Sequence, residues 1–222
     1  MSSPPKFVGL ILAVGILTVS TAAIFIRLAI AAAADNSVGF SLTIGASRLA
    51  IASIVLLPGW QTIKPTKIAR RNLIYAIAAG IFLALHFACW ITSLAFTSIA
   101  ASTTLVTTNP IWVTLIYWIW HKQRPSIKTI LGIVIAVGGS IVVAFSDSDS
   151  AITGSMPLWG NSLALAGAIT VSCYMVCGKQ AQQNLDMTTY ITIAYSTAAL
   201  IMLPLPLVYG YSYWGYSNSV YM

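Results

Sequence analysis

Residues 83–110, LALHFACWITSLAFTSIAASTTLVTTNP, decide the fold of this chain. They form a long apolar segment, a short uncharged break near residues 96–101, and the start of a second apolar segment. The stretch carries His86, Trp90, Asn109 and Pro110 at positions where a helix in water would show charge. An apolar segment of about 20 residues is long enough to cross a bilayer as a helix. The stretch therefore predicts two membrane-spanning helices whose polar residues face the interior of a bundle.

The composition of the whole chain indicates a membrane protein. Of its 222 residues, 58% are hydrophobic and 7% are charged, and the mean hydropathy is +0.87. A soluble domain usually carries about 25% charged residues, so this chain could not cover its own surface in water and needs lipid as its solvent. Most Lys and Arg residues stand between apolar segments, so the net charge of +7 indicates membrane topology rather than nucleic-acid binding.

Seven apolar segments are long enough to span a bilayer. We expect them at residues 7–33, 38–57, 72–96, 100–120, 127–145, 158–178 and 187–209. Pro58 is expected to stop the second span, Pro110 to kink the fourth, Lys179 to end the sixth and Pro204 to bend the seventh. The predicted fold class is an all-α polytopic membrane protein with about seven transmembrane helices.

The distribution of Lys and Arg predicts the orientation of the chain in the cell membrane. With a cytoplasmic N-terminus, Lys6, the basic residues of 64–71 and 122–128, and Lys179 all lie in the cytoplasm. Asp35 and the acidic link at 146–150 then lie outside, where the loops carry no Lys or Arg. We therefore expect a multi-pass protein of the cell membrane with its N-terminus in the cytoplasm.

A short internal repeat suggests two related halves. Thr18-Val19-Ser20 precedes Arg27, and Thr170-Val171-Ser172 precedes Lys179, with the basic residue nine positions after the threonine in both copies. Five spans separate the two starts, and an odd number inverts the second half relative to the first. Secondary transporters use inverted halves for alternating access. The second half offers only two spans against five, which predicts a partial 5+5 inverted repeat.

Several motifs together resemble the EamA-type transporters of the drug/metabolite transporter superfamily. They are residues 94–102 (LAFTSIAAS), 107–112 (TTNPIW), 123–126 (QRPS) and 132–139 (GIVIAVGG). The resemblance implies ten helices in two inverted five-helix repeats around a central cavity. Residues 7–146 resemble one whole unit, residues 158–210 the start of a second, and residues 211–222 form an aromatic tail. Gln123 stands where family members often carry Glu.

From this resemblance we expect a secondary transporter, or a truncated subunit of one, for a small polar metabolite such as an amino acid or other organic acid. The alternative is a truncated membrane fragment that transports nothing. The surface of the absent helices would be supplied by a missing C-terminal half or by a second copy in a homodimer. No nucleophile–base pair, phosphate loop or metal cluster is present, so we expect no enzyme activity, no cofactor and no metal. Cys89, Cys173 and Cys177 are expected to be packing residues.

The candidate substrate-binding residues are Arg48, His86, Trp90, Thr103, Thr107 and Asn109. A guanidinium at the bilayer centre costs about 2.5–3.5 kcal/mol on insertion scales, so Arg48 should contact either a substrate carboxylate or phosphate, or backbone carbonyls. His86 is either a carrier of a coupling proton or a neutral contact between helices. Trp90 lies one helical turn beyond His86, on the same face.

Two further expectations concern structure rather than binding. Arg27 lies near the outer end of its span and is expected to snorkel to lipid headgroups. Gly132, Ala136 and Ser140 recur at four-residue spacing in the fifth span, which predicts a close helix contact there.

Overall fold

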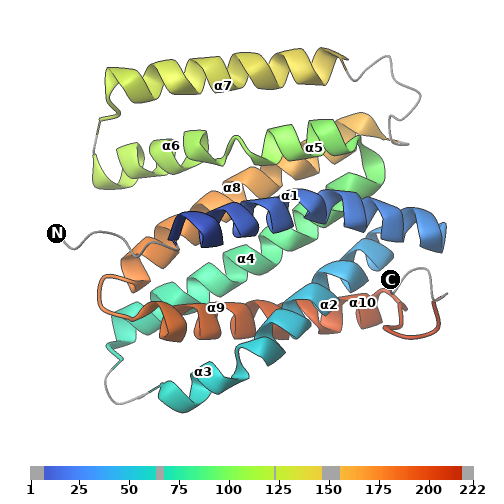
Figure 1. Ribbon diagram of the computed structural model, residues 1–222, viewed down its shortest axis with the longest axis horizontal. Coiled ribbons are helices and arrows are strands. Elements are labelled where there is room, and N and C mark those ends of the chain that lie inside the picture. The colour runs from blue at the N-terminus through green and yellow to red at the C-terminus, as the bar shows by residue number, and fades with distance from the viewer. Residues whose placement is uncertain (1–7, 64–67, 123, 147–155, 217–222) are drawn as a thin grey trace.

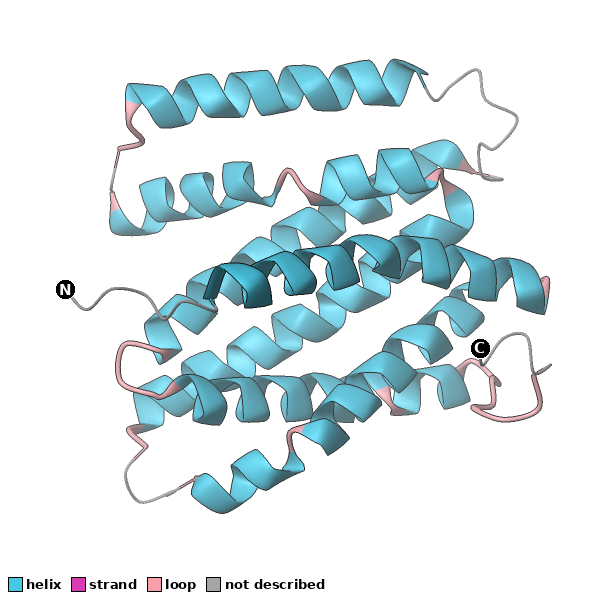
Figure 2. Ribbon diagram, viewed as in Figure 1, coloured by secondary structure: helices cyan, strands magenta, loops and turns pink. Residues whose placement is uncertain are grey.

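The computed structural model describes residues 8–63, 68–122, 124–146 and 156–216. Figure 2 shows that this part of the chain consists of helices joined by short loops. In chain order the described helices are α1 (Val8–Ala33), α2 (Val38–Val55), α3 (Leu57–Thr62), α4 (Arg70–Phe96), α5 (Ile99–Val106), α6 (Asn109–His121), α7 (Ile127–Ser146), α8 (Pro157–Ala181), α9 (Met187–Met202) and α10 (Pro204–Val208).

The expected fold class is confirmed. Six helical segments of the described residues are long and apolar enough to cross a membrane, and the last of them runs from α9 through α10. The shorter apolar helix Ile127–Val142, within α7, accounts for the remaining expected span. The all-α, polytopic membrane architecture follows directly from the apolar segments of the sequence, because a helix satisfies its own backbone hydrogen bonds in lipid.

Helix α4 lies at the centre of the bundle and contacts α1, α2, α5, α8 and α9 (Figure 1). Its most extensive interface is with α8, and the next is with α9. Small residues make the approach to α9 possible: Ala76 and Ala79 are fully buried there, in one cluster with Ala194. Gly80 lies close to the α9 backbone, since a Cβ at this position would lie 2.6 Å from the Ala194 carbonyl oxygen. Close backbone approach of this kind is how helices pack in lipid.

The chain reverses direction from one span to the next (Figure 1). The start of α4, the loop between α6 and α7, and the loop between α8 and α9 therefore lie at one end of the bundle. The described basic residues of these segments gather at this basic end: Arg70, Arg71, Lys122, Arg124, Lys128 and Lys179. The loop that holds Asp35 lies at the opposite end, and α8 crosses the bundle in the direction opposite to α1.

Three expected helix boundaries differ from the structure. The second span ends at Val55, and Pro58 lies in the first turn of α3 instead of ending helical structure, a position that proline favours. The fourth span is interrupted at Thr107 and Thr108, because Pro110 sits at the start of α6 and lacks the N–H that a continuous helix would need. The sixth span continues past Lys179 to Ala181, since a basic residue in the last turn is favourable.

The close contact expected along the fifth span is wrong for the described residues. Gly132 and Ala136 on α7 are exposed, and a Cβ at Gly132 would have nothing within 4 Å. The Ser140 hydroxyl bonds within its own helix, to the Ala136 carbonyl at 2.9 Å. Lipid tails solvate such a face as well as a neighbouring helix would, so small residues alone do not dictate a contact.

Several expectations fall on residues outside the described ranges. They concern Lys6, Phe7, Lys64, Lys67, Gln123, Asp147, Asp149 and Tyr221.

Gly80→Val should destabilise the bundle by about 1–3 kcal/mol, because the new side chain collides with the α9 backbone. Thermal unfolding in detergent would measure the change. Gly132→Val is the matched control, since it makes the same substitution on α7 in open space. Equal unfolding temperatures for the two variants would contradict the packing of α4 on α9.

Candidate functional site

Arg48 lies on α2 and lines a cavity of about 170 Å³. The cavity is formed by α1, α2 and the segment after α10, with Thr43, Ser47 and Tyr213 among its lining residues. The guanidinium carbon is 5.6 Å from the centre of the Phe87 ring on α4, within the range of a cation–π contact. The described acids, Asp35 and Asp186, stand outside the spans, and Arg48 forms no ion pair with either.

His86 joins α4 to α8. The side chain is 8% exposed, and its Nδ1 lies 2.9 Å from the Gly167 carbonyl oxygen. Because a carbonyl oxygen only accepts hydrogen bonds, Nδ1 must carry the proton and donate. This contact is a link between helices, and both the neutral and the protonated imidazole can form it.

Trp90 stacks on His86, as their spacing of one helical turn predicts. The two ring centroids are 5.8 Å apart and the ring planes differ by 12°. The Trp90 side chain is 9% exposed, and among the described residues its indole N–H has no hydrogen-bond partner. A buried Trp N–H usually finds a partner, so this donor is a free polar group inside the bundle.

The structure does not bring Arg48 into one cavity with His86 and Trp90. Phe87 lies between them: its ring contacts the Arg48 guanidinium and lies 5.4 Å from the His86 ring centroid. Arg48 borders the cavity on the α2 side, whereas His86 and Trp90 pack toward α8. Arg48 and the pair of His86 and Trp90 therefore form two neighbouring groups that both contact the Phe87 ring.

Thr103, Thr107 and Asn109 lie at the break between α5 and α6. The Thr103 hydroxyl donates to the Ile99 carbonyl at 2.6 Å, and the Thr107 hydroxyl donates to the Thr104 carbonyl at 2.9 Å. Both hydroxyls are therefore used within their own helix. Asn109 instead reaches α8: its backbone carbonyl accepts from the Ser172 hydroxyl at 3.0 Å, and its amide nitrogen lies 3.6 Å from the Met175 sulfur.

Arg27 does not snorkel to headgroups, so that expectation is wrong. Its Nη1 donates to the carbonyl oxygens of Leu94 and Thr97, and the bond to Thr97 is 3.2 Å long. These carbonyls belong to the last turn of α4, where the helix offers no N–H partners of its own. A half-buried guanidinium can satisfy both, because it carries several donors in a fixed fork. Arg27 therefore links α1 to the C-terminal end of α4 through these hydrogen bonds.

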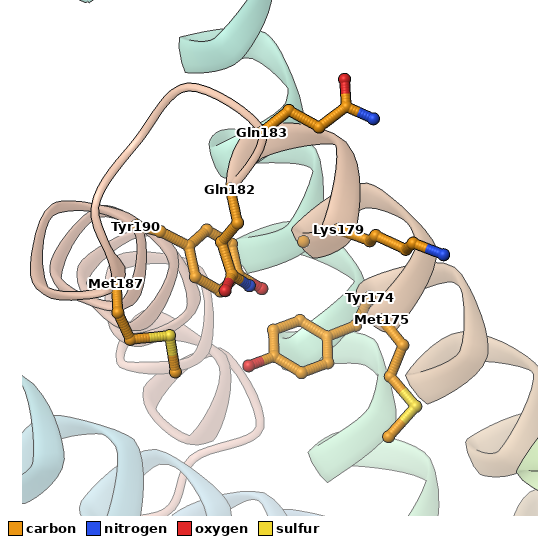
Figure 3. A pocket seen from close by; sticks show the side chains of 8 residues that line it. Tyr174, Met175, Lys179, Gln182, Gln183, Met187 and Tyr190 are labelled. Carbon is orange, nitrogen blue, oxygen red and sulfur yellow. The ribbon is translucent and has the colours of Figure 1, made fainter. Parts of the chain in front are cut away.

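A larger cavity of about 440 Å³ escaped the sequence analysis. It lies where α8 ends and α9 begins, and Figure 3 shows Tyr174, Gln182 and Tyr190 pointing toward one another across it. Lys179 lies on its rim, with its side chain pointing away from these three residues. The polar run KQAQQ at 179–183 was the available signal, and it was interpreted only as the end of a span.

No group of three potential metal ligands occurs among the described residues, and the described cysteines are unpaired. The polar groups that the described residues place inside the bundle are instead hydroxyls, amides, the His86 imidazole, the Trp90 indole and the guanidinium groups of Arg27 and Arg48. Such groups can bind and orient a polar solute.

Residues 7–145 match the EamA-like transporter family. No curated protein matches the chain.

Arg27→Leu should lower the free energy of unfolding by about 1.5–3 kcal/mol, because hydrogen bonds to a charged donor are lost from the end of α4. Unfolding of the purified protein in detergent would measure this loss. Arg124→Leu removes an exposed guanidinium outside the helices and should leave the stability unchanged. An Arg27→Leu protein as stable as the unmodified chain would show that Arg27 does not hold α1 to α4.

Proposed function

Because the chain belongs to the EamA-like transporter family, we propose that it is a secondary transporter for small polar metabolites that carry a carboxylate or a phosphate. Amino acids and other small organic acids are the substrates that fit this description. The family is one of membrane transporters, so the polytopic bundle and the proposed activity agree.

The observation that carries the substrate class is the environment of Arg48. A guanidinium at mid-membrane depth needs water, a counter-charge or hydrogen-bond acceptors. Phe87 contributes a cation–π contact but no negative charge, and no described carboxylate lies at this depth. An acidic group of a substrate in the adjoining cavity of about 170 Å³ would supply the missing charge. A guanidinium binds carboxylate and phosphate groups through two parallel hydrogen bonds.

The way in which the helices meet supports transport by movement of two units. We assign residues 7–146 to one five-helix unit and residues 158–210 to the start of a second, inverted unit. The direction of α8, opposite to α1, fits this assignment (Figure 1). The contacts of His86 with Gly167 and of Asn109 with Ser172 cross between the two parts. Rocking of one inverted unit against the other is the usual basis of alternating access.

The proposed orientation has the N-terminus and the basic end of the bundle in the cytoplasm of the cell. It rests on the gathering of Lys and Arg at that end, which is the known bias of cytoplasmic loops.

Arg48→Gln should abolish uptake of acidic metabolites into proteoliposomes. Loss of a charge-assisted contact to the substrate corresponds to roughly a tenfold or greater loss of apparent affinity. Uptake should be measured for a panel of acidic and neutral metabolites at equal protein content, with the unfolding temperature as a check on folding. Lys128→Gln removes an exposed positive charge from α7 and serves as the matched control. Normal uptake by a folded Arg48→Gln protein would make Arg48 a structural residue.

The orientation predicts a labelling pattern in intact cells. In a cysteine-free background, Asp35→Cys should react with a membrane-impermeant thiol reagent added outside, whereas Lys122→Cys should react only after the membrane is opened. Both positions are exposed or half-buried at helix ends, so the reagent can reach them from their own side. The opposite pattern would reverse the proposed topology.

A further inference from the structure

The cavity between α8 and α9 has a polar rim and a less polar floor. The rim is formed by Lys179, Gln182 and Gln183, in the last turn of α8 and just beyond it. The floor is lined by Tyr174 and Met175, which lie earlier on the same helix, farther from its C-terminal end. From Met175 to Gln182 the helix rises about 10 Å. The volume of about 440 Å³ is within the usual range for ligand sites.

One wall of the cavity is held in place by aromatic packing. The rings of Tyr174 and Tyr190 lie 6.4 Å apart and nearly parallel, with 25° between their planes. Gly178 makes this arrangement possible, because a Cβ there would collide with the Tyr190 hydroxyl and lie 2.8 Å from its Cζ atom. Tyr190 is 2% exposed, so its position is set by the core behind it. The shape of the cavity is therefore determined by the packing of α8 against α9.

The charge around the rim is positive. The Lys179 ammonium lies 4.8 Å from the centre of the Tyr117 ring on α6 and forms no ion pair with a described carboxylate. The cation–π contact holds the ammonium while leaving N–H donors for another partner. Lys122 and Arg124 follow α6 at the same end of the bundle.

Asp186 is the only described acid at this end. Its carboxylate caps α9 by accepting from the Thr189 N–H at 2.9 Å, and this bond holds the pKa of Asp186 below its usual value. The carboxylate is therefore charged at neutral pH but is engaged with its own helix. Against it stand six described Lys and Arg residues, so the basic end remains attractive to anions.

We propose that this cavity binds an anionic phospholipid. The phosphate lies at the rim, where the amide of Gln182 donates to it and Lys179 donates after its side chain turns from the Tyr117 ring. The glycerol and first methylenes lie over Tyr174 and Met175. The gradient from polar rim to less polar floor fits a molecule with a charged head and an apolar tail. Basic pockets between transmembrane helices at the cytoplasmic side are suited to anionic lipid headgroups, and Tyr and Met side chains accommodate flexible apolar chains.

The test uses the purified full chain in detergent with added phosphatidylglycerol or phosphatidylcholine of identical acyl chains. Native mass spectrometry counts the lipid that stays bound, and the unfolding temperature is measured in parallel. Phosphatidylglycerol should be retained and should raise the unfolding temperature, and phosphatidylcholine should do so far less. Lys179→Gln should weaken phosphatidylglycerol binding about tenfold or more, whereas Lys179→Arg, which keeps the charge, should retain it.

Two controls make the assignment specific. Lys128→Gln removes an exposed charge from the same end of the bundle, outside the cavity, and should leave lipid binding unchanged. Glycerol 3-phosphate supplies the head without the tails and should produce no comparable shift in the unfolding temperature. Equal loss of binding in Lys128→Gln and Lys179→Gln would overturn the site in favour of general attraction to the basic end. A full shift with glycerol 3-phosphate would overturn the lipid in favour of a soluble phosphate compound.

If Lys179→Gln proves too unstable to interpret, Gln182→Leu tests the same site through an exposed side chain. It should lower phosphatidylglycerol retention without changing the unfolding temperature in lipid-free detergent. Unchanged phosphatidylglycerol retention in Gln182→Leu would then refute the proposal.

Discussion

The close packing of α4 against α8 and α9 is the constraint on which the rest of the structure depends. Lipid solvates apolar side chains as well as a protein interior does, so helices in a membrane are held by short-range packing and hydrogen bonds. On the α9 side the contact relies on Gly80 and its alanine neighbours. On the α8 side it relies on buried polar links, from His86 to Gly167 and from Thr97 to Asn161, the latter at 2.8 Å.

Two arginines inside apolar segments, Arg27 and Arg48, have different partners for their charged side chains. In the sequence, Arg27 and Arg48 have similar surroundings, each within a long apolar segment without an acidic neighbour. In the fold, Arg27 reaches the end of α4, where unpaired carbonyls take up its donors. Arg48 instead meets an aromatic face and an open cavity. The Arg27 guanidinium is thus hydrogen-bonded to backbone carbonyls, whereas the Arg48 guanidinium borders a cavity.

The spans were predictable because a long apolar segment has few alternatives in a bilayer. The pairing of His86 with Trp90 was predictable for a similar reason, since a spacing of four residues places two side chains on one helical face. The sequence could not place α2 against α4, and so it could not show that Phe87 separates Arg48 from His86. Contacts between distant segments depend on helix rotation and crossing, which local patterns do not encode.

The cavity at the end of α8 was missed for a different reason. Lys179, Gln182 and Gln183 have the composition of an ordinary solvated loop, and nothing local distinguishes a rim from an exposed turn. The cavity forms only because α9 packs beside α8 and places Tyr190 next to Gly178, opposite these residues. The Arg27 contact has the same origin, since its acceptors lie 67 and 70 residues away in the sequence.

The break at Thr107 and Thr108 divides the fourth span into two shorter helices, α5 and α6. An unbroken helix behaves as a rod, so a tilt at one end displaces the other. Here α5 is linked to α4 by a hydrogen bond of 2.6 Å between the hydroxyls of Ser93 and Ser102. Helix α6 is linked to α8 by the hydrogen bond from the Ser172 hydroxyl to the Asn109 carbonyl and by the contact of the Lys179 ammonium with the Tyr117 ring. The span is therefore jointed at residues 107–108: α5 is hydrogen-bonded to α4 and also contacts α8, whereas α6 packs on α8 alone of these two helices.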